Sequence, residues 1–274
     1  MNKVTWVIQT NLLNDLSVHG VWYAATEAGA DVADAIVQPF IDELGNEEFL
    51  QALQVEPDRV VIPYGSTKLT RISQQRGWRG NCFNPETFRT TLWNECRDDM
   101  LNSDAVEMRV RETPEFFKNK DLNEKWFVRP VEDLKAFNGT VTDAGEIIQW
   151  MGHVGESSRF SKHFTEETMI VIAPVKKIYS EARFFVVGGK VVDGSYYRMA
   201  GQLQLKHIEQ AETLQYAQEL ADVWLPHECC VMDIADTDAG LKVIEFNTIN
   251  GSGFYDNRIP VIVNAMTEWA RNLK

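Results

Sequence analysis

Three side chains with oxygen donors lie on two apolar segments near the end of the chain. Asp233 stands in VMDIA, and Glu245 and Asn247 stand in IEFN, shortly before a Gly-Ser-Gly turn. Residues two apart in a strand point to the same face, so Glu245 and Asn247 project together. A short connection at 238–240 makes the two segments antiparallel neighbours, which can bring Asp233 to the same patch.

This donor set matches a hard cation. Burying two unpaired carboxylates is costly, and Mg2+ prefers carboxylate and amide oxygens that it shares with phosphate. The pattern therefore predicts a magnesium site. The alternative is that Asp233 and Glu245 pair with arginines on a partly exposed sheet.

Basic residues accompany the acidic patch. They stand within or beside apolar strands or on the loop after one: Arg129 in WFVRP, Lys135, Arg183 in SEARFF and Arg198 in SYYR. Each alone fits a surface residue whose stem covers apolar neighbours. Together they favour a clamp for a polyphosphate, because arginine offers forked donors to phosphate oxygens. Pro174 interrupts the strand VIAPVKKI, and the backbone groups it leaves unpaired can contact an adenine edge.

A second candidate site lies in IPYGSTKL at 62–69. Tyr64 and Ser66 stand where a strand ends, and α/β sheets commonly place ligands at that end of their strands. The alternative is an ordinary turn before a helix. As a site, the segment would contact a carboxylate or amine substrate.

Bulk properties narrow the possibilities. The chain has 274 residues, and its net charge of −13 disfavours a broad nucleic-acid surface. Its cysteines predict buried, reduced thiols and neither a disulfide framework nor a zinc site, because they form no CxxC pair: Cys82, Cys96, Cys229 and Cys230. We expect no signal peptide and no membrane span, and a cytoplasmic location.

The first hundred residues read as a small α/β unit. We expect a strand at 3–12, a helix at 21–37, a strand at 58–69 and an amphipathic helix at 85–102. A domain boundary is expected near residue 105, before a charged, irregular stretch.

The rest of the chain is richer in strands. Asp143 and Glu146 predict a capping box for a helix to about residue 152. A hairpin is expected at 180–198, with Gly188 and Gly189 in its turn. The remaining expected elements are strand, loop and strand at 125–141, a strand at 168–178, a helix at 205–224, strands at 229–237 and 241–249, and a helix at 260–274.

The order of these motifs resembles the ATP-grasp superfamily. VRP…K…G, then APV, then SEARFFVVGGKVVDGSYYR, then MDIADTDAGLKVIEFNTINGSG is most similar to its RimK-like branch, which includes members common in bacteriophages. The resemblance covers roughly 105–274. It implies an α/β (α+β) fold with two subdomains, 106–172 and 173–274, that grip ATP. Residues 1–105 would form a Rossmann-like pre-ATP-grasp domain.

The resemblance also implies residue roles. For ATP they are Arg129, where the family often has lysine, and Lys135 on the phosphates, Ala173, Pro174 and Val175 against adenine, and Glu181 either on ribose or orienting Arg183. For catalysis they are Arg183 and Arg198 on the γ-phosphate or an acyl phosphate, and Asp233, Glu245 and Asn247 on Mg2+. Asn250, Gly251 and Ser252 would line the acceptor side, and 132–139 would be the flap.

The implied reaction is ATP- and Mg2+-dependent ligation of a carboxylate to an amine through an acyl phosphate. The partners would be small-molecule or peptide substrates, and an oligomer is possible. If a phage encodes the chain, the location would be the host cytoplasm. The alternatives are an ATP-grasp phosphotransferase and a nucleotide-binding module without turnover.

Overall fold

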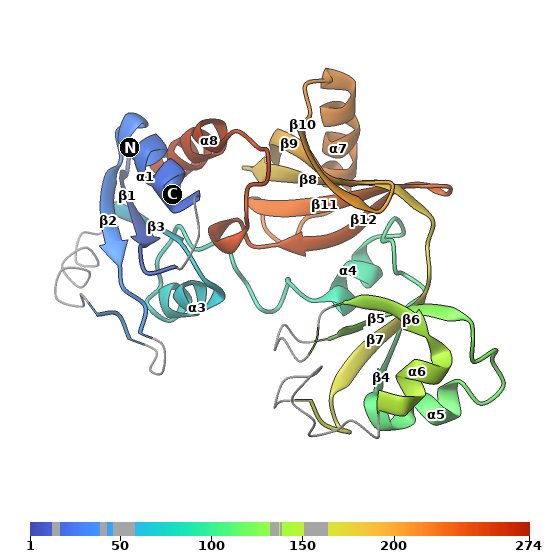
Figure 1. The fold of residues 1–274 in the computed structure, drawn as a ribbon. Helices are drawn as coiled ribbons and strands as arrows, with labels where there is room; N and C mark the ends of the chain where they lie inside the picture. Colours follow the sequence, from blue (N-terminus) through green and yellow to red (C-terminus); the bar gives the residue numbers. More distant parts are fainter. Residues whose placement is uncertain (13–16, 39–42, 46–57, 132–136, 138, 151–163) are drawn as a thin grey trace. The chain divides into compact units, whose positions relative to one another are not determined.

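The computed structural model describes the chain apart from residues 13–16, 39–42, 46–57, 132–136, 138 and 151–163 (Figure 1). The described residues form two compact units. Unit 1 contains Met1–Met100 and Ile178–Lys274, and unit 2 contains Leu101–Lys177. The three domains expected from the sequence stay a prediction; in this division, most of the first and third share unit 1.

A three-stranded parallel sheet forms the N-terminal part of unit 1. Its strands, in the order β2-β1-β3, are β1 (Lys3–Gln9), β2 (Asp31–Ala35) and β3 (Arg59–Tyr64). Two helices from opposite ends of the chain, α1 (Ser17–Glu27) and α8 (Ile259–Arg271), pack against each other beside this sheet (Figure 1). Helix α3 (Thr67–Gln75) follows β3. The predicted α/β unit is confirmed.

The predicted helix at 21–37 is wrong in its second half. Helix α1 ends at Glu27, and Gly29 has a φ of 69°, a left-handed conformation that commonly follows a helix. The residues after it pair with β1 as β2. Strand pairing therefore overrides the alanine-rich composition of this segment.

Helix α4 (Thr90–Cys96) is shorter than the helix predicted at 85–102. The next residue, Arg97, has an extended backbone, and its buried guanidinium donates to the Trp224 carbonyl at 2.6 Å. The same guanidinium pairs with Asp99 at 2.6 Å. A buried guanidinium needs such partners, and the helix ends where the chain turns to reach them.

A five-stranded antiparallel sheet forms the rest of unit 1, in the order β10-β9-β8-β11-β12. Its strands are β8 (Ile178–Val187), β9 (Lys190–Met199), β10 (Gln202–His207), β11 (Cys230–Thr237) and β12 (Gly240–Asn247). The predicted hairpin and the predicted antiparallel pair are confirmed, and Gly188 and Gly189 both have positive φ in the hairpin turn. The helix predicted at 205–224 is wrong at its start, where β10 pairs with β9, so α7 (Ala211–Val223) begins later.

The two faces of this sheet are buried against different partners. One face includes Phe184 and Met232 and packs against α7. On the opposite face, Phe185 and Val231 join the core that also contains residues of β1, β3, α1 and α8. Further along this second face the side chains become polar, and we call that polar part the site face.

Unit 2 contains a four-stranded antiparallel sheet in the order β4-β7-β5-β6. Its strands are β4 (Val106–Arg109), β5 (Lys125–Pro130), β6 (Thr140–Asp143) and β7 (Met169–Pro174). Its helices are η1 (Val110–Glu112), α5 (Thr113–Phe116) and α6 (Ala144–Gln149). An aromatic cluster that includes Phe117, Trp126 and Trp150 fills its core.

The predicted capping box of α6 is wrong. Asp143 is the N-cap residue, but its side chain makes no capping hydrogen bond. The Glu146 carboxylate instead accepts a hydrogen bond from the Thr142 hydroxyl. The helix therefore begins at the predicted place through a different side-chain contact.

Candidate active site

Arg183, Asp233 and Glu245 lie opposite one another on three neighbouring strands. Arg183 of β8 pairs in register with Asp233 of β11, and Asp233 pairs with Glu245 of β12. Directly opposed residues of an antiparallel sheet have β-carbons about 4.5–5.5 Å apart. The predicted approach of the two carboxylates is therefore confirmed, and an arginine joins them.

A bulge in β12 sets this alignment. Ile234 of β11 pairs with Val243, whereas Asp233 pairs with Glu245, so Ile244 is an extra residue. The insertion lets Val243 and Phe246, three residues apart, both enter the core beneath α7. Glu245 is then free to belong to the opposite face with Asp233.

Asp233 and Arg183 form a buried bidentate ion pair. Nε of Arg183 donates to Oδ1 at 2.8 Å and Nη2 donates to Oδ2 at 2.7 Å, and the two residues are 9% and 2% exposed for Arg183 and Asp233. Burial raises the pKa of Asp233 to about 6; the Arg183 guanidinium opposes this rise and the charge of Glu245 adds to it. Burial lowers the pKa of Arg183, but the hydrogen bond and charge of Asp233 outweigh it and raise that pKa overall. The alternative in which a carboxylate pairs with an arginine is thus correct for Asp233.

Glu245 and Asn247 supply further oxygen donors. Nδ2 of Asn247 donates to Oε1 of Glu245 at 3.0 Å, which confirms that these side chains project together. A carboxylate has about four acceptor positions, and the two bonds from Arg183 leave others on Asp233. Two carboxylates and an amide oxygen match the ligands that Mg2+ prefers. The residues present therefore fit this cation.

Glu181 and Arg198 form a second ion pair near the first. Nη1 of Arg198 lies 3.3 Å from Oε1 of Glu181, and Arg198 is half exposed. Glu181 stands two residues before Arg183 on β8, so both share a face. Burial, the charges of Asp233 and Glu181, and a hydrogen bond with Glu181 raise the pKa of Tyr197. Both roles expected for Glu181 stay predictions.

Tyr255 is a candidate that sequence reasoning missed. Its ring stacks on Tyr197 with centroids 4.9 Å apart, and the Arg183 guanidinium carbon lies 4.7 Å from its centroid. Its φ of 51° is rare for a non-glycine residue and such conformations cluster at functional sites. Arg183 also donates to the Gly253 carbonyl at 3.1 Å. The available signal was an aromatic residue just after the Gly-Ser-Gly turn.

The structure brings the two predicted substrate segments together. The Gly65 amide donates to the Asn250 carbonyl at 2.9 Å, and the buried Tyr64 hydroxyl donates to the Ser252 carbonyl at 3.5 Å. Ser66 is the N-cap residue of α3. A side chain on Gly251 would place its β-carbon 2.9 Å from the Gly65 carbonyl oxygen, so the close approach requires glycine.

Asn250 fixes this junction with its whole side chain. Its Nδ2 donates to the carbonyls of Pro63 and Gly80 at 2.9 and 3.1 Å, and its Oδ1 accepts from the Cys82 amide at 2.7 Å. The residue is 2% exposed. Because these polar atoms are already bonded within the fold, we expect Asn250 to position the segment rather than contact substrate directly.

Asn250→Ala is expected to lower the free energy of unfolding by about 3 kcal/mol, since three buried backbone groups lose a partner and each unsatisfied group costs about 1–3 kcal/mol. Ser252→Ala is the matched control, because its buried hydroxyl donates one hydrogen bond, to the Thr248 carbonyl at 2.8 Å. That variant should lose about 1 kcal/mol. Urea unfolding monitored by tryptophan fluorescence compares them, and equal losses would refute the bracing role.

The other predicted ATP-binding residues belong to unit 2. Arg129 lies half-buried on β5, where it pairs in register with Val171 of β7. Ala173 is fully buried, Pro174 ends β7, and Val175 is 47% exposed. Lys135 and most of the proposed flap at 132–139 lie outside the described residues. The assigned roles of these residues stay predictions.

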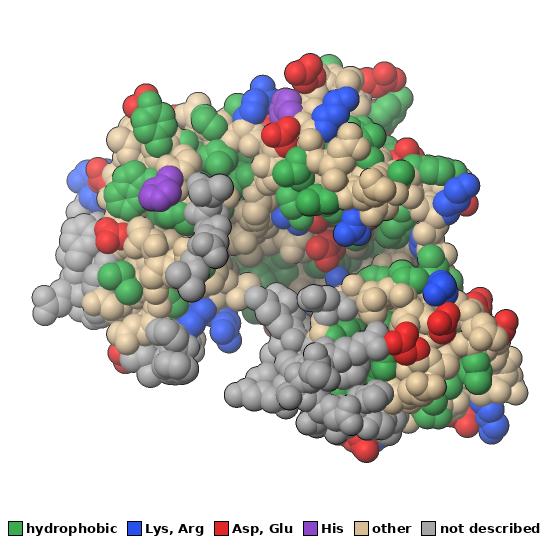
Figure 2. Space-filling view, viewed as in Figure 1, with side chains coloured by type: hydrophobic (Ala, Val, Ile, Leu, Met, Phe, Trp, Pro, Cys, Tyr) green, Lys and Arg blue, Asp and Glu red, His purple; other side chains and the backbone are tan. Residues whose placement is uncertain are grey.

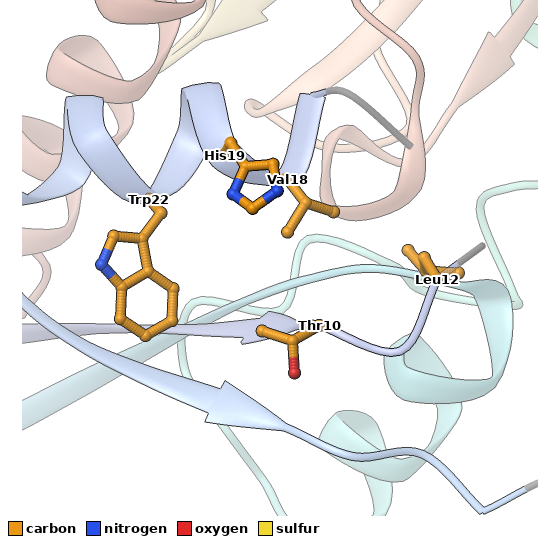
Figure 3. Close-up of a pocket in the computed structure, with 5 residues that line it drawn as sticks. All are labelled: Thr10, Leu12, Val18, His19 and Trp22. Atoms are coloured by element: carbon orange, nitrogen blue, oxygen red, sulfur yellow. The ribbon is translucent and has the colours of Figure 1, made fainter. Parts of the chain in front are cut away.

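Other surface features lie apart from these residues. A cavity of about 300 Å3 in unit 1 is lined by side chains of α1 and of the segment after β1: Thr10, Leu12, Val18, His19 and Trp22 (Figure 3). None of the residues assigned above to phosphate or metal lines it. On the face shown in Figure 2, described basic and acidic side chains are interspersed and form no continuous basic area. Among the described helices, none is long and apolar enough to cross a membrane.

The two antiparallel sheets with their helices, and the site face of unit 1, define an ATP-grasp protein. A family model described as an ATP-grasp domain, family 3 of its clade, matches residues 57–267, and the chain belongs to this family. The resemblance drawn from the sequence is confirmed. No curated protein sequence gives a significant match.

Solved structures share the fold at low sequence identity. D-cycloserine synthetase DcsG superposes with a TM-score of 0.62 at 8% identity, over 98% of this chain and 99% of that one. A RimK domain ATP-grasp protein from Sphaerobacter thermophilus gives 0.58 at 10%, over 97% and 99%. The D-alanine–D-alanine ligase of Bacillus anthracis complexed with ATP gives 0.57 at 12%, over the full length of both chains.

Proposed function

We propose that the protein is an ATP- and Mg2+-dependent ligase that joins a carboxylate to an amine through an acyl phosphate. The observation that carries the proposal is the register of Arg183, Asp233 and Glu245 across three strands of an ATP-grasp fold. Two of the similar structures are a synthetase and a ligase of amino-acid-sized compounds by their titles, which supports a small carboxylate or amine substrate. Peptide substrates belong to the same proposal. Because the reaction consumes ATP, we place it in the cytoplasm.

The reaction has two steps. A substrate carboxylate oxygen attacks the γ-phosphorus of ATP, and the bond to the β-phosphate oxygen breaks to release ADP. The amine nitrogen then attacks the carbonyl carbon of the acyl phosphate, inorganic phosphate leaves with the electron pair of the C–O bond, and the nitrogen loses a proton. Neither step needs a covalent bond to the protein, so catalysis depends on positioning and charge.

The side chains divide this work. Asp233, Glu245 and Asn247 would hold Mg2+, which when bound neutralises phosphate charge and orients the phosphate oxygens. Arg183 and Arg198 donate hydrogen bonds to the transferring phosphoryl group. In the proposal Asp233 also fixes the Arg183 guanidinium in its orientation, as their bidentate pair permits.

Nucleotide binding is proposed for the residues of unit 2 and for Glu181. Arg129, with Lys135, would contact the phosphates, the segment 173–175 would contact adenine, and Glu181 would contact the ribose or orient Arg183. The exposed side chain of Val175 suits contact with a flat apolar base.

The direct test is ADP release from Mg-ATP over a panel of amino acids, peptides and amines, with EDTA as the metal-free control. We expect ADP and phosphate only when a carboxylate substrate and Mg2+ are both present. Hydroxylamine should trap the acyl phosphate as a hydroxamate. ADP release with transfer of phosphate to a hydroxyl, and no hydroxamate, would replace the ligase with a phosphotransferase. ATP binding without turnover on any panel member would leave only a nucleotide-binding module.

Tyr255→Ala should weaken the site more than Tyr255→Phe. Phenylalanine keeps the ring that contacts Arg183 and Tyr197, whereas alanine removes it. Such ring and cation contacts contribute about 0.5–2 kcal/mol, so we expect a loss in kcat/KM of roughly threefold to thirtyfold for alanine alone. Steady-state ADP release measures both variants, and equal losses would assign the effect to the hydroxyl.

A further inference from the structure

A cluster of metal-ligating side chains lies outside the site face. The ligand atoms of Cys82, His227 and Cys229 all lie within 4.8 Å of one another. Both cysteines are fully buried, and His227 is half-buried. Sequence spacing gave no such prediction, because Cys82 belongs to the N-terminal segment of unit 1 and the other two precede β11.

Cys82 is held in place by the polar junction around Asn250. Its amide donates to Oδ1 of Asn250 at 2.7 Å, and its thiol donates to the Gly80 carbonyl at 3.6 Å. The Gly80 amide in turn donates to the Val61 carbonyl of β3 at 3.0 Å. The sulfur position is therefore set by a network in which each backbone group has a partner.

Cys229 and His227 are fixed by the hairpin turn and by α8. The Gly188 amide donates to the Cys229 sulfur at 3.4 Å, a contact that suits a sulfur carrying negative charge. Nδ1 of His227 accepts from the Cys229 amide at 2.9 Å, and its ring meets the Trp269 ring edge-on at 6.1 Å. The neighbouring Cys230 belongs to the core on the opposite face of the sheet.

The two sulfurs differ in their acidity. Burial raises the pKa of Cys229, but hydrogen bonds with Cys82, His227 and Gly188 outweigh it and lower that pKa to about 7. Burial and the hydrogen bond with Cys229 raise the pKa of the Cys82 thiol. This difference accords with one sulfur that is ready to bind a cation and a second that deprotonates on binding.

We propose that Cys82, His227 and Cys229 form a binding site for one thiophilic divalent cation of the zinc class. Two sulfurs and an imidazole nitrogen are the ligands that Zn2+ prefers, and three protein ligands leave a fourth position for water, which can enter beside the half-buried histidine. The bound ion would join the segment after β3 to the start of β11. Its donors are soft, so it is separate from the oxygen-rich site proposed for Mg2+.

The test uses the reduced, full-length protein after treatment with a chelator. Titration with Co2+ should give sulfur-to-cobalt charge-transfer absorption that saturates at one equivalent, and Zn2+ should displace it while Mg2+ should not. Zn2+ at about 100 times its dissociation constant should raise the melting temperature by several degrees.

Variants locate the site. Cys82→Ala, Cys229→Ala and His227→Gln should each lower metal affinity at least tenfold. Cys96→Ser and Cys230→Ala are the matched controls, exposed and buried respectively, and should keep it. Glu245→Gln should also keep it, which separates failure of this site from failure of the proposed ligase. His227→Gln alters a half-buried residue and serves if a buried cysteine variant does not fold.

Three results would overturn the proposal. The first is the absence of charge-transfer absorption at stoichiometric Co2+. The second is unchanged affinity in the folded His227→Gln variant. The third is a Cys82–Cys229 disulfide, identified by peptide mass spectrometry after air exposure, in a protein that binds no Zn2+ when reduced; that result would assign the pair to redox chemistry.

Discussion

Glu245→Gln should reduce Mg2+-dependent ATP turnover by about two to three orders of magnitude, comparable to the loss of one transition-state donor in other enzymes. The substitution keeps the size of the side chain and its acceptor for Asn247, whose amide lies 3.0 Å away. It removes one of the two carboxylates that lie opposite each other on β11 and β12. ADP release gives the rate, and calorimetry with a non-hydrolysable ATP analogue gives the Mg2+ dependence of binding.

Asp236→Asn is the matched control for this loss of charge. Asp236 also lies on β11 but is exposed, and in register it faces Leu241. Its turnover should stay within about twofold of the unmodified protein, as expected for an exposed charge that is remote from the reaction. A Glu245→Gln protein with the turnover of the control would rule out a metal-binding role for this carboxylate.

Arg183→Met should lower the free energy of unfolding by about 3–5 kcal/mol, because it leaves the Asp233 carboxylate buried without its ion-pair partner. The expected loss is large because Asp233 is 2% exposed and accepts both of its side-chain hydrogen bonds from this arginine. Urea unfolding gives the stability. The same variant should lose ADP release, since the proposed donor to the phosphoryl group is gone.

A double variant separates stability from catalysis. Arg183→Met with Asp233→Leu replaces the buried pair with apolar groups and should recover most of the lost stability. It should not recover ADP release. Arg198→Met tests the exposed pair, because its arginine is 50% exposed and the change in stability should stay below about 1 kcal/mol. Recovery of ADP release in the double variant would contradict the assignment of Arg183 to the reaction.

The strands that carry the site face were predictable because their signals are local. Alternation along VMDIA and IEFN and the short connection between them predict which side chains share a face, and the structure agrees for Asp233, Glu245 and Asn247. The bulge at Ile244 was not predictable, because an inserted residue leaves no mark in an apolar run. The bidentate contact of Arg183 with Asp233 follows from strand order, which only the folded sheet determines.

Errors arose where distant partners decide the local structure. The segment at 31–35 becomes a strand because β1 is beside it, and 205–207 becomes part of an edge strand because β9 is beside it. Cys82 and Cys229 look unrelated in the sequence, and only the packing of the N-terminal segment against the hairpin turn joins them. Such long-range pairings do not follow from periodicity or propensity.

The assembly of unit 1 from both ends of the chain has a consequence for its synthesis. Apolar side chains of β1 and β3, such as Trp6 and Ile62, complete their core only with residues as late as Met266 on α8. A ribosome therefore presents the first hundred residues with that apolar surface uncovered until the last helix has emerged. Nascent chains stalled before α8 should expose this surface to chaperones, and removal of α8 should leave an aggregation-prone product.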